Sequence, residues 1–187
     1  MRIAVPTESV PGERRVALVP ESCKKLIQSG YQVAIESGAG QRAGFADADY
    51  RELGVAIGSD PAALLGSADL VLKVTAPAKG DAGRDEIGWM HPGTTYLGSL
   101  MPLRNLAAVR ALAARKVTAF STDAIPRTTR AQAMDTLSSM ASIVGYKGVI
   151  LAAAELNRYF PMQNKVTIQS ARTSLFESEI TSGGFVR

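Results

Sequence analysis

The chain has very few of the residues that commonly mark redox, metal or acid–base sites: its 187 residues include one cysteine, one histidine and one tryptophan. A single cysteine, Cys23, excludes an intramolecular disulfide, and its helical surroundings favour a buried thiol. The only histidine, His91, precedes Pro92 in a predicted turn. We interpret it as a loop residue rather than an acid–base catalyst, and no metal site is predicted.

Long apolar runs are also missing. No stretch approaches the roughly 18 consecutive apolar residues of a membrane span, and the opening "MRIAVPTES" is too short in apolar residues for a signal segment. We therefore expect a soluble, cytoplasmic chain with no direct membrane insertion.

The composition nevertheless predicts a folded core, with 46% hydrophobic and 20% charged residues. The net charge of +4 raises the possibility of a nucleic-acid partner. The basic residues are scattered, however, and many lie beside acids, as in residues 13–15 and 84–86. No nucleic-acid partner is predicted.

Short apolar runs alternate with helical patterns, which is typical of βαβ units and a parallel sheet. We expect an α/β fold with a doubly wound, mostly parallel sheet, a Rossmann-like first subdomain, and a long C-terminal helix. The predicted strands cover residues 2–5, 31–36, 68–74, 94–100 and 117–121. The predicted helices cover residues 19–30, 47–54, 60–67 and 103–116, with Asp47 as N-cap of the second.

A long proline-free stretch from residue 131 to about 159 predicts a helix of roughly 40 Å. Gly145 and Gly148 leave a kink or break open. The expected domain organisation is an α/β subdomain at residues 1–130, an inter-domain helix at 131–160, and a divergent tail at 161–187 without a second Rossmann domain.

The stretch "GAGQRA", residues 38–43, matches the dinucleotide-binding pattern G-x-G-x-x-A. A working fingerprint must open a helix so that backbone N–H groups face the diphosphate. Here the helix signal starts only at Asp47, whose charge would occupy the place of the diphosphate. We interpret the motif as a connecting loop.

The densest polar constellation is "DAIPRTTRAQAMDTLSSM", residues 123–140. Arg127 and Arg130 come at or just before a predicted helix N-terminus, which favours anions. On a helix starting near residue 131, Gln132, Asp135 and Ser139 would share one face. That face suits a polar ring and a phosphate, although a capped helix with a solvated face has the same pattern.

A second cluster contains Arg15, which follows a Pro-Gly turn, and Lys73, which lies inside the apolar run "LVLKVTAP". A lysine there is costly unless it reaches a strand end or finds a partner. The two cations could bind a carboxylate together, or each could be a surface charge with a buried stem.

Three segments together resemble a known family: residues 1–50, "LVLKVTAP" and "PRTTRAQAMDTLSSMASIVGYKGVILAAAE". They are similar to the N-terminal part of the NAD(H)-binding component, the alpha subunit, of proton-translocating NAD(P) transhydrogenase. The resemblance covers roughly residues 1–163, and R-x-x-R-A-Q-x-x-D-x-L-S-S is its most specific part. It implies an oxidoreductase that passes hydride between NAD(H) and NADP(H), coupled to proton translocation in the full complex.

The same resemblance implies site residues. Arg127 would lie near the diphosphate and nicotinamide of NAD(H), Gln132 and Asp135 would fix the ring for hydride transfer, and Ser138 and Tyr146 would line the same cleft. The implied partners are the NADP(H)-binding and membrane components and a second copy in a homodimer. The implied location is cytoplasmic and peripheral to the inner membrane.

Two other interpretations remain open. Alanine dehydrogenase has a similar opening, and there Arg15 and Lys73 would hold a substrate carboxylate. Its catalytic histidine would fall at Met101, however, and His91 lies on the wrong side of Gly93. The other interpretation is a non-catalytic scaffold module that has lost cofactor binding.

After "YFPM" the family continues into a strand–G-x-G-x-x-G–helix unit with most of the NAD contacts, whereas this sequence continues "QNKVTIQSARTSLFESEITSGGFVR". We expect a chain truncated relative to the family, with weak or no NAD(H) affinity and no activity by itself.

Overall fold

The computed structural model describes residues 1–78, 80 and 83–156, and the chain divides into two compact units, Met1–Met134 and Asp135–Arg187. The first unit contains a sheet flanked by helices. The described part of the second unit is a single long helix with its cap. Each unit is described by itself.

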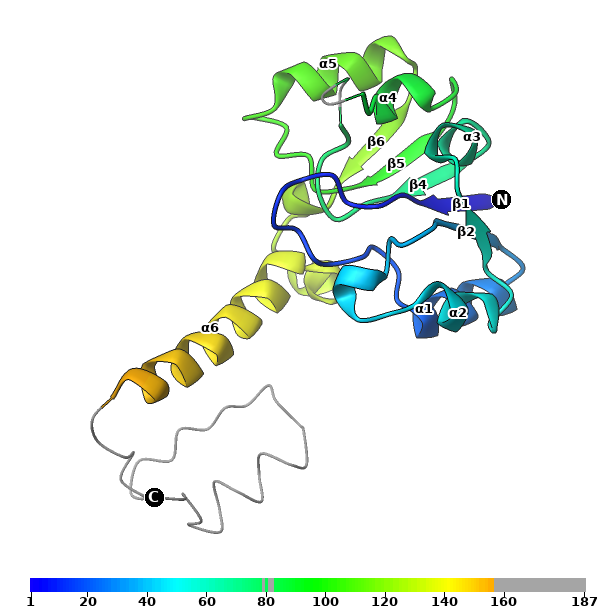
Figure 1. Ribbon diagram of the computed structural model, residues 1–187. Helices are drawn as coiled ribbons and strands as arrows, with labels where there is room; N and C mark the ends of the chain where they lie inside the picture. The colour runs from blue at the N-terminus through cyan, green and yellow to red at the C-terminus, as the bar shows by residue number, and fades with distance from the viewer. Residues whose placement is uncertain (79, 81–82, 157–187) are drawn as a thin grey trace. The chain divides into compact units, whose positions relative to one another are not determined.

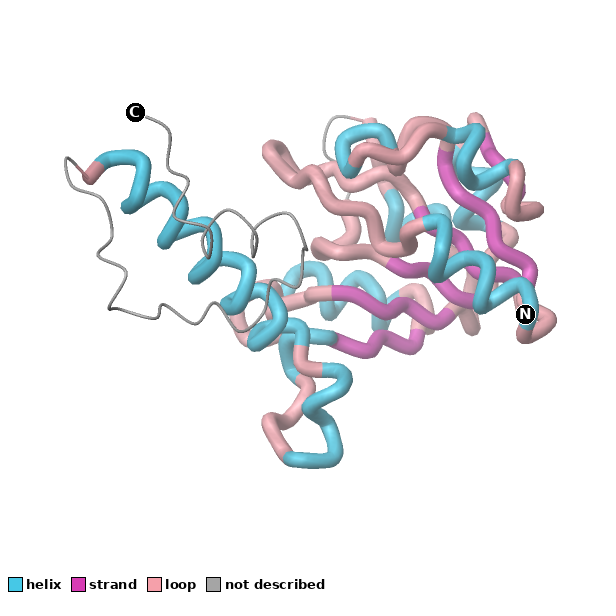
Figure 2. Tube along the Cα trace, turned by 90° about the horizontal axis from the view of Figure 1, so that it is seen from below, coloured by secondary structure: helices cyan, strands magenta, loops and turns pink. Residues whose placement is uncertain are grey.

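Within the described residues, six strands form one sheet in the order β3-β2-β1-β4-β5-β6 (Figures 1 and 2). Every neighbouring pair is parallel. The strands are β1 (Arg2–Val5), β2 (Gln32–Glu36), β3 (Ala56–Gly58), β4 (Leu70–Leu72), β5 (Thr95–Gly98) and β6 (Thr118–Ser121). This order is that of a doubly wound Rossmann-type sheet, so the predicted fold class is confirmed.

Helices cover both faces of the sheet (Figure 1). One face carries α1 (Pro20–Gln28) and α2 (Asp47–Arg51), and the other carries α3 (Pro61–Gly66), α4 (Glu86–Trp89) and α5 (Leu106–Ala114). Two buried clusters match these layers, one around Val5, Ile35 and Tyr50 and the other around Val71 and Tyr96. Burial of these apolar side chains against the sheet provides the main driving force for the fold.

The sequence did not predict β3, because three residues ending in a glycine are too few to show alternation. Two other short-range signals worked well. Asp60 caps α3 by accepting a hydrogen bond from the Ala62 amide, and Asn105 caps α5 through the Ala108 amide.

The long helix begins later than predicted. Thr129–Met134 form a 3-10 helix (η3), Asp135 is the N-cap, and α6 runs from Thr136 to Glu155. The Asp135 side chain accepts hydrogen bonds from the Leu137 and Ser138 amides, which starts the helix there. The predicted break does not occur, and the predicted tail (residues 161–187) lies outside the described residues.

The expectation that no segment has the character of a membrane span was wrong for α6. By length and composition alone this 20-residue helix could cross a membrane, with a mean hydropathy of 1.4 and none of it buried. Its apolar residues are spread around the whole circumference, so it has no polar face of the usual soluble kind.

Candidate functional site

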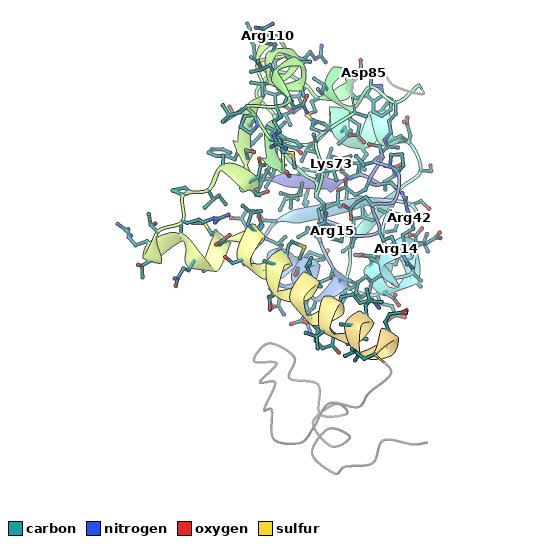
Figure 3. All side chains as sticks on the ribbon, turned by 90° about the vertical axis from the view of Figure 1, so that its left-hand side faces the viewer. Arg14, Arg15, Arg42, Lys73, Asp85 and Arg110 are labelled. Carbon is teal, nitrogen blue, oxygen red and sulfur yellow. The ribbon has the colours of Figure 1, made fainter. Side chains whose placement is uncertain are left out.

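The order of the strands singles out one edge of the sheet. Strand order reverses between β1 and β4, and open α/β sheets bind ligands in the crevice outside the carboxyl ends of the strands at such a switch point. The segments entering this crevice begin at Pro6 after β1 and at Lys73 after β4. Figure 3 shows Lys73 towards the middle of the sheet, whereas Arg110 lies on α5 at its outer side.

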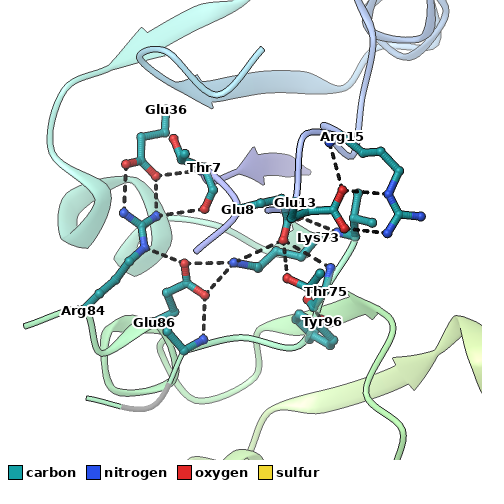
Figure 4. A network of polar contacts seen from close by, with 12 residues as sticks. Thr7, Glu8, Glu13, Arg15, Glu36, Lys73, Thr75, Arg84, Glu86 and Tyr96 are labelled. Atoms are coloured by element: carbon teal, nitrogen blue, oxygen red, sulfur yellow. Dashed lines mark hydrogen bonds and ion pairs between the residues drawn. The ribbon is translucent and has the colours of Figure 1, made fainter. Parts of the chain in front are cut away.

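Lys73 is held inside this crevice by two glutamates (Figure 4). Its Nζ lies 3.0 and 2.8 Å from the two carboxylate oxygens of Glu86, and 3.7 Å from Oε2 of Glu8. The side chains of Lys73 and Glu86 are fully buried, and that of Glu8 is 2% exposed. A buried lysine is tolerated here because its charge is paired and hydrogen-bonded.

Arg84 extends the network to the end of β2. Its guanidinium makes a bidentate pair with Glu36, at 3.0 and 2.5 Å, and its Nε donates to Glu86 at 2.7 Å. The hydrogen bonds to Glu36 and Glu86 raise the pKa of Arg84 despite its partial burial. Glu36 also accepts a hydrogen bond from the Thr7 amide at 2.8 Å, which joins the carboxyl ends of β1 and β2.

Glu8 joins β1 to β4. Its carboxylate accepts from the Val74 amide at 2.6 Å, from the Thr75 amide at 3.2 Å and from the Thr75 hydroxyl. The Tyr96 hydroxyl donates to the Thr75 carbonyl at 2.8 Å. Burial, with the charges of Glu8 and Glu86 nearby, raises the pKa of Tyr96 and keeps its phenol neutral.

We call these five charged residues the switch-point network: Glu8, Glu36, Lys73, Arg84 and Glu86. Three carboxylates face two cations, a formal net charge of −1. Among the described residues, no buried side-chain nitrogen or oxygen lacks a hydrogen-bond partner. The protein's own charges therefore satisfy one another in the crevice that other doubly wound sheets use for ligands.

The proposed carboxylate pair of Arg15 and Lys73 is divided between two sets of partners. Arg15 is exposed and contacts Glu13 through hydrogen bonds of 2.9, 2.8 and 2.5 Å. The side-chain hydrogen bond from Arg15 lowers the pKa of Glu13 to about 2, against the effect of burial. Lys73 would have to leave Glu86 and Glu8 before it could hold a ligand.

The G-x-G-x-x-A loop is closed by a carboxylate. Asp47 accepts from the Gly38 amide at 2.9 Å and from the Ser37 hydroxyl at 2.7 Å. These hydrogen bonds lower the pKa of Asp47, so the residue is ionised at neutral pH. Ala46 is the N-cap of α2, which corrects the predicted capping role of Asp47. The place of a diphosphate at this turn is thus taken by a negative charge of the protein itself.

The second glycine of the motif has a packing role. A Cβ at Gly40 would lie 2.7 Å from Cε2 of Tyr50 and 2.9 Å from the Phe45 carbonyl oxygen. Only a three-residue 3-10 helix follows (Gln41–Ala43), and Arg42 donates to the Glu8 carbonyl at 2.8 Å. The loop follows β2 rather than β1, so it supports the network from one side and does not lie at the switch point.

The segment predicted to contact a cofactor follows β6. In the first unit, Arg127 and Gln132 are both exposed, and Ala131 between them is buried. Gln132 belongs to the 3-10 helix η3 and not to a regular α-helix. The segment therefore presents an arginine and an amide to solvent on an irregular backbone.

In the second unit, Asp135 and Ser138 form a cap. The carboxylate of Asp135 accepts from the amides of Leu137 and Ser138, both at 3.1 Å, and from the Ser138 hydroxyl at 2.6 Å. Tyr146 lies on α6 and is partly exposed. The predicted helical face of Gln132, Asp135 and Ser139 was wrong, because Asp135 ends the non-helical segment and its side chain turns back to the helix amides.

Several network residues were missed at the sequence level. Glu8, Glu36, Arg84 and Glu86 were interpreted only as charges near other charges. Their signal was the buried lysine: a cation in an apolar run requires a buried anion, and Glu8 and Glu36 each stand at or just after the end of a strand. Among the described residues, no group of three or more His, Cys, Asp or Glu could hold a metal ion.

Comparison with known proteins supports a specific ancestry. A sequence model described as "Alanine dehydrogenase/PNT, N-terminal domain" matches residues 4–144. The first of the separate chains that form NAD(P) transhydrogenase subunit alpha in Rhodospirillum rubrum is 41% identical over 178 residues, covering 94% of this chain and 46% of that protein. Alanine dehydrogenase of Mycobacterium tuberculosis is 29% identical over 184 residues, covering 98% of this chain and 42% of that protein.

The solved structure of transhydrogenase from Sinorhizobium meliloti is also similar, with 38% identity and a TM-score of 0.78. The match covers 87% of this chain and 47% of that one. The chain thus spans about half the length, or less, of the relatives it matches. On its sequence, its strand order and these similarities, the chain belongs to the alanine dehydrogenase/PNT family, whose N-terminal domain it contains, and it is similar to the N-terminal region of NAD(P) transhydrogenase subunit alpha.

Proposed function

We propose that this chain contributes the N-terminal part of the NAD(H)-binding component of an NAD(P) transhydrogenase. In the full assembly, hydride would pass directly between NAD(H) and NADP(H), coupled to proton translocation in membrane components. The observation that carries the proposal is the 41% identity to a transhydrogenase alpha subunit over nearly the whole chain, including residues 127–138.

The described residues fit one part of the cofactor and not another. Arg127 and Gln132 are exposed and offer a guanidinium and an amide to a polar ring or a phosphate. The G-x-G-x-x-A turn does not fit a diphosphate, because Asp47 already occupies the Gly38 amide. Most of the affinity for NAD(H) would then come from a second, Rossmann-type domain outside the described residues.

NAD(H), when bound, supplies the hydride, and the protein supplies position and a site without water. In this proposal Arg127 binds near the diphosphate and nicotinamide, while Gln132 and Asp135 hold the ring for transfer. Ser138 and Tyr146 line the same cleft. The Asp135 carboxylate is pre-oriented by its cap hydrogen bonds, so little entropy would be lost when it acts. Direct hydride transfer needs no general acid.

An alanine-dehydrogenase-like function is the second candidate, supported by similarity over 98% of the chain. It would use Arg15 and Lys73 for a substrate carboxylate. The internal pairing of Lys73 with Glu86 argues against it, since a carboxylate ligand would compete with a fully buried one. Met101 at the position expected for the catalytic histidine argues the same way. A non-catalytic scaffold is the third candidate.

The test supplies an NAD(H)-binding Rossmann domain in trans and follows NADH binding by calorimetry and transhydrogenation by absorbance. We expect weak binding by the chain alone and activity only in the mixture with the NADP(H)-binding component. Gln132→Ala should lower the rate by about 10- to 100-fold, as expected for a lost positioning contact. The matched control is Gln28→Ala, an exposed glutamine at the end of α1.

Asp135 needs a separate variant because it also caps α6. Asp135→Asn keeps a capping side chain and removes the charge, so a lower rate would report on the cofactor rather than on the helix. Micromolar NADH binding by the chain alone, worth about 8 kcal/mol, would contradict the proposed division of contacts. An active mixture in which Gln132→Ala matches Gln28→Ala would contradict the site.

A further inference from the structure

The carboxylate of Asp123 joins two loops at the carboxyl edge of the sheet. It follows β6, in the 3-10 turn η2 (Thr122–Ala124), and accepts from the amides of Leu100 and Met101, both at 2.9 Å. The Ser121 hydroxyl donates to it at 2.6 Å. The loop after β5 is thereby attached to the turn after β6 by a single side chain.

This attachment holds an uncommon backbone. Met101 has φ +46°, a left-handed conformation that non-glycine residues adopt at a cost. Its carbonyl accepts from the amides of Arg104 and Asn105, at 2.8 and 2.9 Å. The Met101 side chain is 55% exposed, so its packing does not account for the conformation. The charged acceptor on its amide does.

The same carboxylate stands shortly before the segment of the proposed cofactor contacts. Arg127 comes four positions after Asp123, and residues 126–130 are exposed. The buried residue that follows is Ala131, 7% exposed. Within the first unit, the path of Arg127 is therefore fixed on one side by Asp123 and on the other by the packing of Ala131.

The carboxylate is ionised at neutral pH. Burial opposes its ionisation, but the hydrogen bonds from Ser121 and from the Leu100 amide outweigh that effect and lower the pKa of Asp123. An ionised acceptor makes stronger hydrogen bonds with the two amides than a neutral amide oxygen would.

We propose that Asp123 is a positioning residue: by clamping the Leu100–Met101 amides it sets the place from which the segment with Arg127 and Gln132 reaches the nicotinamide ring. The inference rests on the proposed function and adds a residue that touches no cofactor. It predicts that loss of the clamp disturbs the geometry of hydride transfer more than it disturbs the binding of NADH.

The test uses Asp123→Asn, which leaves one acceptor oxygen and turns an NH₂ group towards a backbone donor. The matched control is Asp60→Asn, which makes the same chemical change at an exposed carboxylate that accepts a backbone amide, that of Ala62. In the mixture with the NAD(H)-binding domain and the NADP(H)-binding component, we expect Asp123→Asn to lower kcat at least about tenfold. KM for NADH should change less than about threefold, and Asp60→Asn should leave both within about a factor of two.

A second measurement does not depend on activity. Amide exchange by NMR in the chain alone should be about tenfold faster at Leu100 and Met101 in Asp123→Asn, and the signals of residues 127–132 should shift. Asp60→Asn should alter neither. Equal kcat in the two variants of an active mixture would overturn the positioning role and leave the proposed function standing.

If the wild-type mixture is inactive, the proposed function fails and the NMR result decides the clamp. Unchanged signals at residues 127–132 in Asp123→Asn would overturn it. Shifted signals there, with none in Asp60→Asn, would support Asp123 as the residue that sets this segment.

Discussion

Removing one charge from the switch-point network should destabilise the first unit by an amount that depends on which sign is removed. Lys73→Met leaves three carboxylates facing only Arg84, a formal charge of −2, and Glu86 is fully buried. Glu86→Gln leaves two carboxylates and two cations, a formal charge of zero, with Glu8 still 3.7 Å from Lys73. The lysine variant should therefore be the less stable of the two.

Breaking a buried pair typically costs about 3–5 kcal/mol, because the remaining charge stays unpaired. We expect Lys73→Met at or above the middle of that range. Glu86→Gln should be lower, at about 2–3 kcal/mol, because its amide oxygen still accepts one hydrogen bond. Adding Glu86→Gln to Lys73→Met removes the excess negative charge, so the double variant should be more stable than Lys73→Met alone.

Urea unfolding followed by tryptophan fluorescence measures this directly. Trp89 is the only tryptophan of the chain and closes α4, the helix that carries Glu86, so the signal reports on the first unit. Glu21→Gln is the control, since the pair of Glu21 with Lys25 is 3.3 Å long with both side chains mostly exposed. It should change stability by less than about 0.5 kcal/mol.

Two results would refute this reasoning. One is a loss below about 1 kcal/mol for Lys73→Met, which would mean that water or a counter-ion reaches Glu86 and Glu8. The other is a greater loss for Glu86→Gln than for Lys73→Met, which would mean that net charge does not govern the network.

Two further predictions concern the α1/α2 side of the sheet. Gly40→Ala should cost about 1–3 kcal/mol through overpacking, since its Cβ would lie 2.7 Å from Tyr50, whereas Gly58→Ala, with its nearest contact at 3.7 Å, should cost clearly less in the same urea assay. Equal losses would mean that Tyr50 yields freely. Stability should also fall above about pH 9: burial raises the pKa of Cys23 from 9.0 to about 11 and that of Tyr50 from 10.0 to about 12. Their neutral forms stabilise the fold fully below about pH 9, and this is lost as pH rises through about 9–11, because the unfolded chain ionises first. Urea midpoints from about pH 7 to 11 should show it, with a smaller decline in Cys23→Ala; rapid labelling of native Cys23 at about pH 8 would contradict it.

Much of the fold could be predicted from the sequence. The strands around Ile3, Ile35, Val71 and Tyr96 stood out as short apolar runs between helical patterns, and the cap at Asp60 was recognisable from its place before a proline. The interpretation of "GAGQRA" as a loop also agrees with the structure, since the helix starts only after the motif. Strand β3 was not predictable, because three residues carry too little pattern.

The candidate site was less predictable. Lys73 stood out as an anomaly, yet its partner Glu86 lies in a short helical turn after a polar, glycine-rich stretch. Asp123 was noticed as part of a polar stretch, without any sign that it would bind the Leu100 amide, 23 residues earlier. Asp135 was expected on a helix face and is instead the N-cap, because its own side chain ends the irregular segment.

The sequence by itself determined which segments become strands and helices and which family the chain belongs to, because periodicity and caps depend on neighbours three or four residues apart. Only the tertiary structure decided which charges neutralise one another. Glu8 reaches the Val74 amide across 66 residues, and Lys73 reaches Glu86 across 13. Such pairs arise because a parallel sheet gathers the carboxyl ends of distant strands at one edge. Burial there makes every unpaired charge costly, so the edge that could have held a ligand is filled by the chain's own carboxylates and cations.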